Sequence, residues 1–218
     1  MISERLKTLG GFVREGSKLA DIGTDHGLLP IYLVENGIAV AAIASDLREG
    51  PAAVARKNVE KAGLSAYIDV RVGDGLAGIS PDEADDIVIA GMGGETIVEI
   101  LSAAPWVKHS RYRLILQPMS HAEILREWLY SHGFATLTER LLEDVGRKYI
   151  VLVSAYTQTP VPYDELAYWR GALESPEGRP FWRKTALYLT QRADGCEARG
   201  EADAATHWRE LAAALSKL

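Results

Sequence analysis

Residues that build cross-links and metal sites are scarce in this sequence. The single cysteine, Cys196, excludes an intrachain disulfide and leaves no thiolate metal site, and we interpret it as incidental. The histidines at 109, 121, 132 and 207 show no metal-ligand spacing with acids or with the cysteine. We therefore expect no bound metal.

Long apolar runs and an excess of positive charge are also missing. No run approaches the ~20 residues of a membrane span, and the N-terminus is charged and lacks a signal-peptide core. These absences favour a soluble, cytoplasmic protein without a membrane partner. The net charge of −6 differs from the basic balance that nucleic-acid-binding domains tend to have. An RNA contact would therefore depend on local basic clusters.

The sequence does contain a nucleotide-binding turn within residues 18–29. A short apolar run ends in acid-x-Gly-x-acid-x-Gly, beginning at Asp21, and then becomes helical. Gly23 and Gly27 fit positions where the backbone turns sharply and where a ligand comes close. Dinucleotide enzymes usually carry a third glycine where this chain has Asp25, an anion that would repel a diphosphate and tolerate a sulfonium or ammonium group. The turn therefore favours S-adenosylmethionine over NAD.

Three further apolar runs end in polar or glycine turns. The second run ends in Asp46, which lies 46 − 23 = 23 residues after Gly23, where a Rossmann-type fold places the acid that accepts the ribose hydroxyls. A helix N-cap is the alternative role for this residue. Asp74, after the third run, is placed to accept an adenine amine, although Gly73 to Gly75 alone could be an ordinary tight turn. The fourth run leads into 91–94, a glycine-rich segment that lets backbone lie beside a ligand.

Helical and strand patterns alternate along most of the chain, which has 218 residues and a hydrophobic share of 47%. Strands are expected at 18–22, 40–45, 67–72, 86–90 and 112–116, and helices at 28–36, 49–62, 94–103 and 120–131, after a short amphipathic helix that carries Ile2, Leu6, Leu9 and Val13. Two last runs, 134–142 and 148–156, flank a hairpin turn at 143–147. This series predicts an α/β, Rossmann-like methyltransferase sheet, mostly parallel with one antiparallel strand at the end.

The pattern changes after the prolines at 160 and 162, and 163–218 is expected to be helical, interrupted only at 175–180 and near 195–200. We expect an antiparallel hairpin in which Leu187, Tyr188 and Leu189 face Trp208, Leu211, Ala212 and Leu215. The predicted domains are a methyltransferase domain over 1–157 and a coiled-coil-like helical domain over 163–218. The alternative is that these helices simply cover the sheet.

The sequence resembles the bacterial tRNA adenine-22 N1-methyltransferases over residues 1 to about 156. The resemblance is carried by segments 20–27, 29–33, 44–46, 49–51, 73–76, 89–94 and 116–118. Its most specific part is Ala90-Gly91-Met92-Gly93-Gly94. It implies a class I S-adenosylmethionine domain with a C-terminal helical coiled coil, and methyl transfer to N1 of an adenine in the D-arm of tRNA.

Site residues follow from the motifs and the resemblance together. The expected cofactor contacts are Asp21, Gly23, Thr24, Asp25, His26, Gly27, Asp46, Asp74, Gly75, Gly91 and Met92. Met92 and Gly93 are expected to shape the face where the target base enters, with Gln117 and Pro118 across from them. Asp25 is either a stabiliser of the cationic product or a contact for the cofactor's amino group. His26 is expected to be a pocket or helix-start residue rather than a general base.

RNA contacts are expected from three basic clusters. They are Lys108, Arg111 and Arg113; then Arg140, Arg147 and Lys148; and then Arg179, Arg183 and Lys184, with Phe181 and Trp182 as stacking or packing groups. A solvated surface is the alternative role for each cluster. Competing functions are a methyltransferase for a small molecule or another RNA, a non-catalytic cofactor-binding protein and, disfavoured by Asp25, an NAD-dependent oxidoreductase. The oligomeric state is open, with a monomer favoured.

Overall fold

The computed structural model describes residues 2–144, 146–160, 164–174 and 176–218. The chain divides into two compact units, Met1–Val161 and Pro162–Leu218, and each is described by itself. Within the described residues, no helix combines the length and the apolarity needed to cross a membrane.

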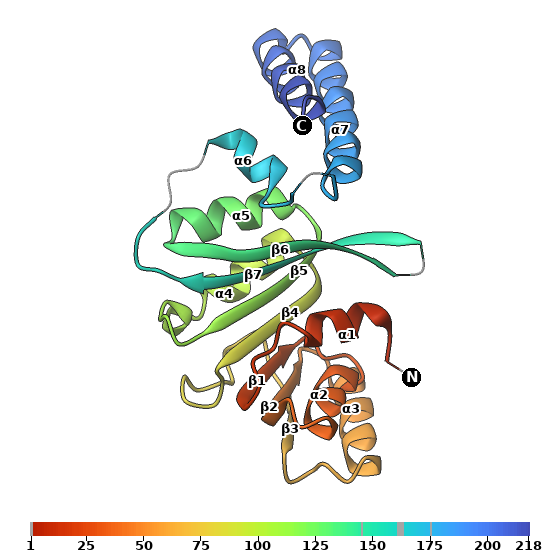
Figure 1. Cartoon of the computed structure of the whole chain (residues 1–218), viewed down its shortest axis with the longest axis vertical. Coiled ribbons are helices and arrows are strands. Elements are labelled where there is room, and N and C mark those ends of the chain that lie inside the picture. Colours follow the sequence, from red (N-terminus) through yellow and green to blue (C-terminus); the bar gives the residue numbers. More distant parts are fainter. Residues whose placement is uncertain (1, 145, 161–163, 175) are drawn as a thin grey trace. The chain divides into compact units, whose positions relative to one another are not determined.

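The first unit is built on one seven-stranded sheet with the order β3-β2-β1-β4-β5-β7-β6 (Figure 1). Its strands are β1 (Ser17–Ile22), β2 (Ala39–Asp46), β3 (Ile68–Val72), β4 (Asp86–Gly93), β5 (Arg113–Ser120), β6 (Phe134–Asp144) and β7 (Arg147–Tyr156). β1 to β5 pair in parallel, whereas β7 runs antiparallel to both β5 and β6. The predicted fold class is confirmed, and its one antiparallel strand is the last strand in the chain.

Helices cover both faces of this sheet, as a parallel sheet requires. On one face lie α1 (Glu4–Gly10), α2 (Leu28–Glu35) and α3 (Glu49–Lys61), and on the other lie α4 (Gly94–Ser102) and α5 (Ala122–Ser131) (Figure 1). A core of buried aliphatic side chains, including Leu9, Leu33, Val88 and Ile115, fills the space beneath the first group. Because β1 and β4 are covered on both sides, their sequences read as continuous apolar runs.

The predicted elements of this unit all form, and their ends differ in three instructive places. β4 continues through the glycine-rich segment to Gly93, with Met92 opposite Pro118 and Gly93 opposite Ser120 after shifts of register. Asp46 is the last residue of β2 and not the N-cap of α3, which is Arg48. The hairpin turn is shorter than predicted, because β6 ends at Asp144 and β7 starts at Arg147; Val145 lies outside the described residues.

The second unit contains α6 (Glu165–Arg170), α7 (Arg179–Ala198) and α8 (Ala202–Ser216). α7 and α8 form the predicted helical hairpin, joined at 199–201. The interruption that was predicted near 195–200 starts later, because α7 continues through Gly195 to Ala198. An unpredicted break follows α6 at Gly171, whose φ is +70°. The residues at 161–163 and 175, which include parts of two predicted breaks and the predicted domain start, lie outside the described residues.

The facing residues of this hairpin are only partly as predicted. Leu189 on α7 is fully buried, and Ala212 and Leu215 on α8 are buried as well. Leu187 and Tyr188 are exposed, at 60% and 47%, so the prediction that they face α8 is wrong. Three consecutive helical residues span about 200° of the helix circumference, and only one of them can face a single partner.

Candidate cofactor and substrate site

The glycine turn after β1 adopts the left-handed conformations that its sequence suggested. Gly23 and Gly27 have φ values of +74° and +70°, and Asp25 shares this region with φ +54°. The N–H groups of Gly23 and Thr24 donate to the carbonyl of Ser45 at 2.8 and 2.9 Å, which ties the turn to β2. Non-glycine residues at such φ values are strained and concentrate at functional sites. Asp25 is therefore held in place by the turn around it.

Gly23 and Gly27 have different neighbours. A side chain at 23 would collide with the terminal methyl of Met92, so this glycine lets the β4 segment approach the turn. A Cβ at 27 would lie 3.3 Å from the Cβ of Ala55 on α3, and Gly27 also caps α2. Gly27 is thus required by helix packing and its φ value, and Gly23 faces the open side of the turn.

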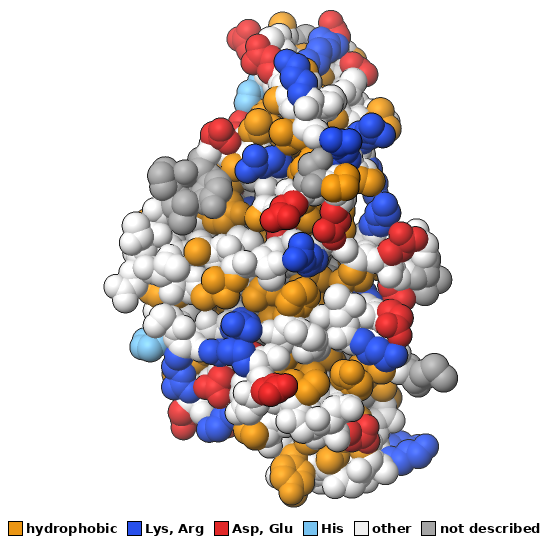
Figure 2. All heavy atoms as spheres, in the orientation of Figure 1, with side chains coloured by type: hydrophobic (Ala, Val, Ile, Leu, Met, Phe, Trp, Pro, Cys, Tyr) orange, Lys and Arg blue, Asp and Glu red, His pale blue; other side chains and the backbone are white. Residues whose placement is uncertain are grey.

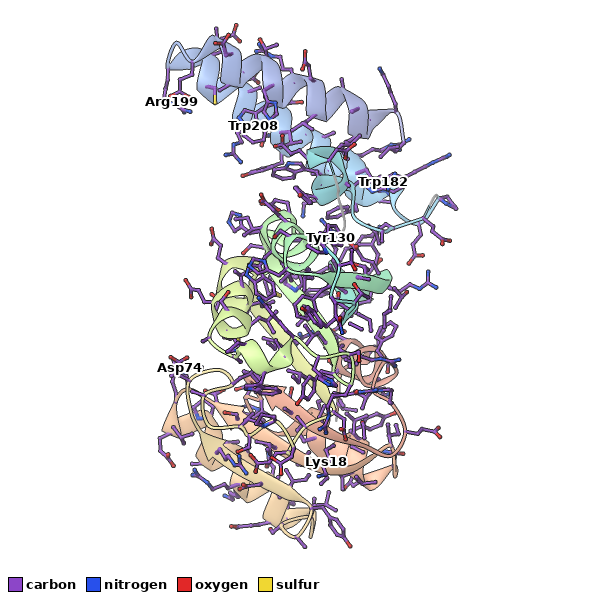
Figure 3. The ribbon with its side chains drawn as sticks, turned by 90° about the vertical axis from the view of Figure 1, so that its left-hand side faces the viewer. Lys18, Asp74, Tyr130, Trp182, Arg199 and Trp208 are labelled. Atoms are coloured by element: carbon purple, nitrogen blue, oxygen red, sulfur yellow. The ribbon has the colours of Figure 1, made fainter. Side chains whose placement is uncertain are left out.

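The two predicted carboxylates of the nucleoside site follow the adjacent strands β2 and β3. Asp46 is buried, and its Oδ1 accepts the N–H of Arg48 at 3.0 Å while its Oδ2 accepts the N–H of Asp25 at 3.4 Å. Asp74 is exposed at the outer edge of the domain (Figure 3). Backbone N–H groups therefore fix the orientation of the Asp46 carboxylate, whereas the Asp74 carboxylate stays open to a ligand.

A cleft of about 600 Å³ connects these turns. Among the predicted residues it is lined by Gly23, Asp25, Asp46, Asp74, Gly75, Gly91 and Met92. Leu47, 65% exposed, and Ile100 also line it and were not predicted. They provide apolar contact area in a cleft that carries its polar groups at the strand ends. Its volume is in the range of small-molecule and cofactor sites.

A second cavity of about 80 Å³ adjoins the cleft and shares Gly23, Asp25 and Ala90 with it. Asp21, Thr24 and His26 line this cavity, whereas Gly27 and Gly93 line neither. His26 is exposed, and its Nε2 lies 3.5 Å from Oδ1 of Asp25. Apart from Gly27, the predicted cofactor residues therefore line a large or a small compartment.

Asp21 is the buried acid of the small compartment. Its Oδ2 accepts the Thr24 hydroxyl at 2.7 Å. The pKa of Asp21 is raised to about 6, mainly because burial disfavours the charged carboxylate; the Thr24 hydrogen bond and the charge of Arg5 oppose this rise, and the nearby Asp46 adds to it. The carboxylate form thus prevails above about pH 6 but has few partners to stabilise it. It is suited to meet a cationic group of a ligand.

The ends of β4 and β5 form the wall next to Met92. Gln117 is fully buried, and its Nε2 donates to the Pro118 carbonyl at 3.1 Å and to Sδ of Met119 at 3.4 Å. Its Oε1 accepts a hydrogen bond of 2.7 Å from Nη1 of Arg5. The wall therefore includes Arg5, which no motif marked, because α1 carries it to a site built by residues 112 positions later.

The three basic clusters are placed very differently. Arg111 pairs with Asp85 at 2.8 Å, and Arg113 donates to the Phe12 carbonyl at 3.2 Å. These contacts lie at the amino ends of β4 and β5, whereas the cleft lies at the carboxyl ends of the strands. The first cluster, which includes the exposed Lys108, is therefore on the side of the sheet away from the cleft. On the face in Figure 2, basic and acidic side chains are mixed, without one continuous basic patch on the sheet unit.

The second and third clusters occupy the β6–β7 hairpin and α7. Arg147 and Lys148 are exposed and stand opposite Asp144 and Glu143 in the strand register, and Arg140 is exposed on the neighbouring strand. Arg179 and Arg183 line a cavity of about 210 Å³ in the second unit, and Lys184 is exposed beside them. Trp182 is buried and donates its indole N–H to the Arg170 carbonyl at 2.9 Å, so it packs within the helical unit (Figure 3).

Comparison with known proteins shows that this chain is similar to methyltransferases in sequence and in structure. A family described as "Methyltransferase domain" matches residues 2–152. A Bacillus subtilis tRNA (adenine(22)-N(1))-methyltransferase is 44% identical over 175 residues, which are 80% of this chain and 74% of the relative. The chain belongs to the tRNA (adenine(22)-N(1))-methyltransferase family.

Solved structures of this family extend the match to both units. A putative tRNA (m1A22) methyltransferase from Streptococcus pneumoniae is 35% identical, with a TM-score of 0.87 over 99% of this chain and 100% of its own. The structure of that protein in complex with S-adenosyl-L-methionine matches with a TM-score of 0.85, 35% identity and the same coverage. The likeness of this methyltransferase thus includes the C-terminal helices, which lie beyond the residues, 1 to about 156, over which its sequence resembles the family.

Proposed function

We propose that this chain is an S-adenosylmethionine-dependent methyltransferase that methylates N1 of adenine 22 in the D-arm of tRNA. The observation that carries the proposal is the cleft at the carboxyl ends of β1 to β4, in a chain 44% identical to a relative with that activity. The catalytic domain would cover 1–157, and the helical domain over 163–218 would contact RNA.

The residues of the cleft fit this cofactor. Asp46 presents a fixed carboxylate to the ribose hydroxyls, Asp74 an open one to the adenine amine, and Leu47 and Ile100 apolar area to the adenine ring. At Gly75, φ is +54° and a Cβ would lie 3.0 Å from Cγ1 of Ile100, so only glycine keeps this wall of the cleft in place. Asp25 replaces the glycine that a diphosphate would require.

The cofactor supplies an electrophilic methyl group on a sulfonium. The adenine N1 lone pair is already a nucleophile, so the protein mainly has to align the base and exclude water, and no strong base is needed. Met92 and Gly93, opposite Pro118 and Ser120, would form the face that receives the base. Asp25 lies on the cleft and its carboxylate would stabilise the cationic product. N1 is on the pairing edge, so the base must leave its pair before it reacts.

The test is methyl transfer from labelled S-adenosylmethionine to unmodified tRNA transcripts with A or G at position 22. We expect label at N1 of A22 and none in the G22 transcript. Asp46→Ala should weaken cofactor binding about 100-fold or more, because hydrogen bonds to a charged acceptor are lost, and the exposed Asp82→Ala is the matched control. Cofactor binding without label in tRNA, or equal label in the G22 transcript, would refute the proposal.

A further inference from the structure

Met119 is an exposed methionine at the carboxyl end of β5. Apart from Met1, the sequence has two methionines, and each lies where a strand ends on the cleft side of the sheet, Met92 on β4 and Met119 on β5. Met119 is 51% exposed, although β5 is an inner strand of the sheet. It therefore has apolar surface that the packing of the domain does not use.

A row of contacts holds the sulfur of Met119 in place. Nε2 of Gln117 donates to this Sδ at 3.4 Å and to the Pro118 carbonyl at 3.1 Å. Oε1 of Gln117 accepts from Nη1 of Arg5 at 2.7 Å, and the guanidinium carbon of Arg5 lies 5.7 Å from the ring centroid of Tyr149 on β7. An unbranched methionine side chain is otherwise flexible. The buried amide of Gln117 thus orients an exposed thioether.

The register between β4 and β5 leaves Met119 without a cross-strand neighbour on β4. Met92 pairs with Pro118 and Gly93 with Ser120, so Met119 falls at the shift between these two pairs. Gly93 contributes no side chain, and a Cβ there would lie 3.4 Å from Oγ of Ser120. Beside Met119, the end of β4 therefore presents backbone that a flat ring can approach.

The position of Met119 relative to the cleft indicates what its surface contacts. Met119 lines neither the large nor the small compartment, whereas Met92, which pairs with the preceding Pro118, lines the large one. Met119 is therefore next to the expected cofactor contacts and outside them. A neutral thioether makes favourable contacts with aromatic rings, whereas an RNA phosphate is bound by cations. The chemistry of this side chain thus fits a nucleobase.

We propose that Met119 packs against the ring of the target adenine and stabilises the base after it has left its pair. This inference rests on the proposed function and adds a substrate-contacting residue to it. The contact forms only with the extruded base, while most of the affinity for tRNA comes from its phosphates. Met119 would therefore affect the rate of methyl transfer more than the affinity for tRNA.

Single-turnover methylation at saturating tRNA and cofactor tests the assignment in the full chain. We expect Met119→Ala to lower the rate on the A22 transcript about 3- to 10-fold and to leave the affinities for tRNA and S-adenosylhomocysteine within about twofold. Met119→Leu, which keeps apolar bulk, should stay within about twofold of the wild-type rate. A tRNA with 2-aminopurine at position 22 reports extrusion by its fluorescence, and Met119→Ala should reduce the increase that the wild-type protein causes.

Val40→Ala is the matched control, because Val40 is 53% exposed at the amino end of β2, away from the cleft. It should change none of these values. A wild-type rate in Met119→Ala would overturn the proposal, as would a slow variant with an unchanged 2-aminopurine signal. A parallel loss of S-adenosylhomocysteine affinity would also overturn it, because Met119 would then act through the shape of the cleft. A failure of the proposed function is distinguishable, because wild-type protein would then bind S-adenosylhomocysteine and leave tRNA unlabelled.

Discussion

Individual carboxylates in this protein differ in how far the fold removes them from water. Asp21 is buried with the Thr24 hydroxyl at 2.7 Å, whereas Asp25, four residues along, has a side chain that is 71% exposed. Desolvation disfavours the charged form of the first and leaves the second solvated. Two acids of one motif thus differ in solvation: Asp21 is suited to a cationic group that enters the buried compartment, and Asp25 remains in contact with water.

The raised pKa of Asp21 predicts how stability changes with pH. The pKa is about 6 in the folded protein and 3.8 in the unfolded chain, so the folded state retains a proton that the unfolded chain has lost between these values. The free energy of unfolding should therefore fall by about 2 kcal/mol as pH rises from 4 to 7. Asp21→Asn removes this titration.

Urea unfolding of both proteins at several pH values measures the effect. The stability of Asp21→Asn relative to wild type should increase from pH 4 to pH 7 and then stay constant. The exposed Asp82→Asn serves as the control and should follow the wild-type curve. Parallel curves for wild type and Asp21→Asn would contradict the burial argument.

Residues of the site could be predicted where local sequence carries the constraint. Gly23, Asp46 and Asp74 follow apolar runs at the spacing of successive strands, so a pattern within about 30 residues reveals each one. Arg5 and Tyr149 could not be found this way, because they are far apart in the sequence and only the complete sheet brings them together. Leu47 looks like an ordinary apolar residue until its exposure at the cleft is known.

At the scale of elements, the junction of β4 and α4 determines the position of the wall next to Met92, which would receive the target base. α4 starts at Gly94 directly after β4 ends at Gly93, with no loop between them. A Cβ at 94 would collide with the carbonyl oxygen of His121, which itself has φ +53° before α5. The sequence predicted a glycine turn here, but not that pairing with β5 continues through it.

Gly94→Ala should consequently disturb the packing of two adjacent junctions. We expect a loss of about 1–3 kcal/mol in the free energy of unfolding, as for other overpacked sites, measured by the urea midpoint at constant m-value. Gly50→Ala is the control, because nothing lies within 4 Å of a Cβ there and the residue is in α3. Its stability should stay the same or rise slightly. Equal effects of both substitutions would disprove the steric explanation.

At the scale of the whole molecule, a net charge of −6 must be reconciled with a polyanionic substrate. Local basic groups then have to supply the attraction, and the exposed Arg183 and Lys184 of α7 are two of them. Each phosphate contact contributes about 0.7 to 0.9 to the slope of log affinity against log salt concentration.

Replacing both residues by alanine should weaken tRNA binding, reduce that slope by about 1 to 2 and leave S-adenosylhomocysteine binding unchanged. Filter binding at several salt concentrations gives the slope. The control is the Lys57→Ala, Lys61→Ala double variant, which removes the same charge from exposed positions on α3. If both double variants reduce the slope equally, general electrostatics would explain tRNA binding without a contact from α7.

The hydrogen bond between Arg5 and Gln117 also has a consequence for synthesis on the ribosome. The glycine turn, Asp46 and Asp74 are all made within the first third or so of the chain, but the partners of Arg5 emerge only with β5 and β7. A nascent chain that ends before Tyr149 lacks the ring that holds the guanidinium. The small compartment, which α1 helps to line, is therefore complete only after β7, the last strand of the sheet in chain order, has been synthesised.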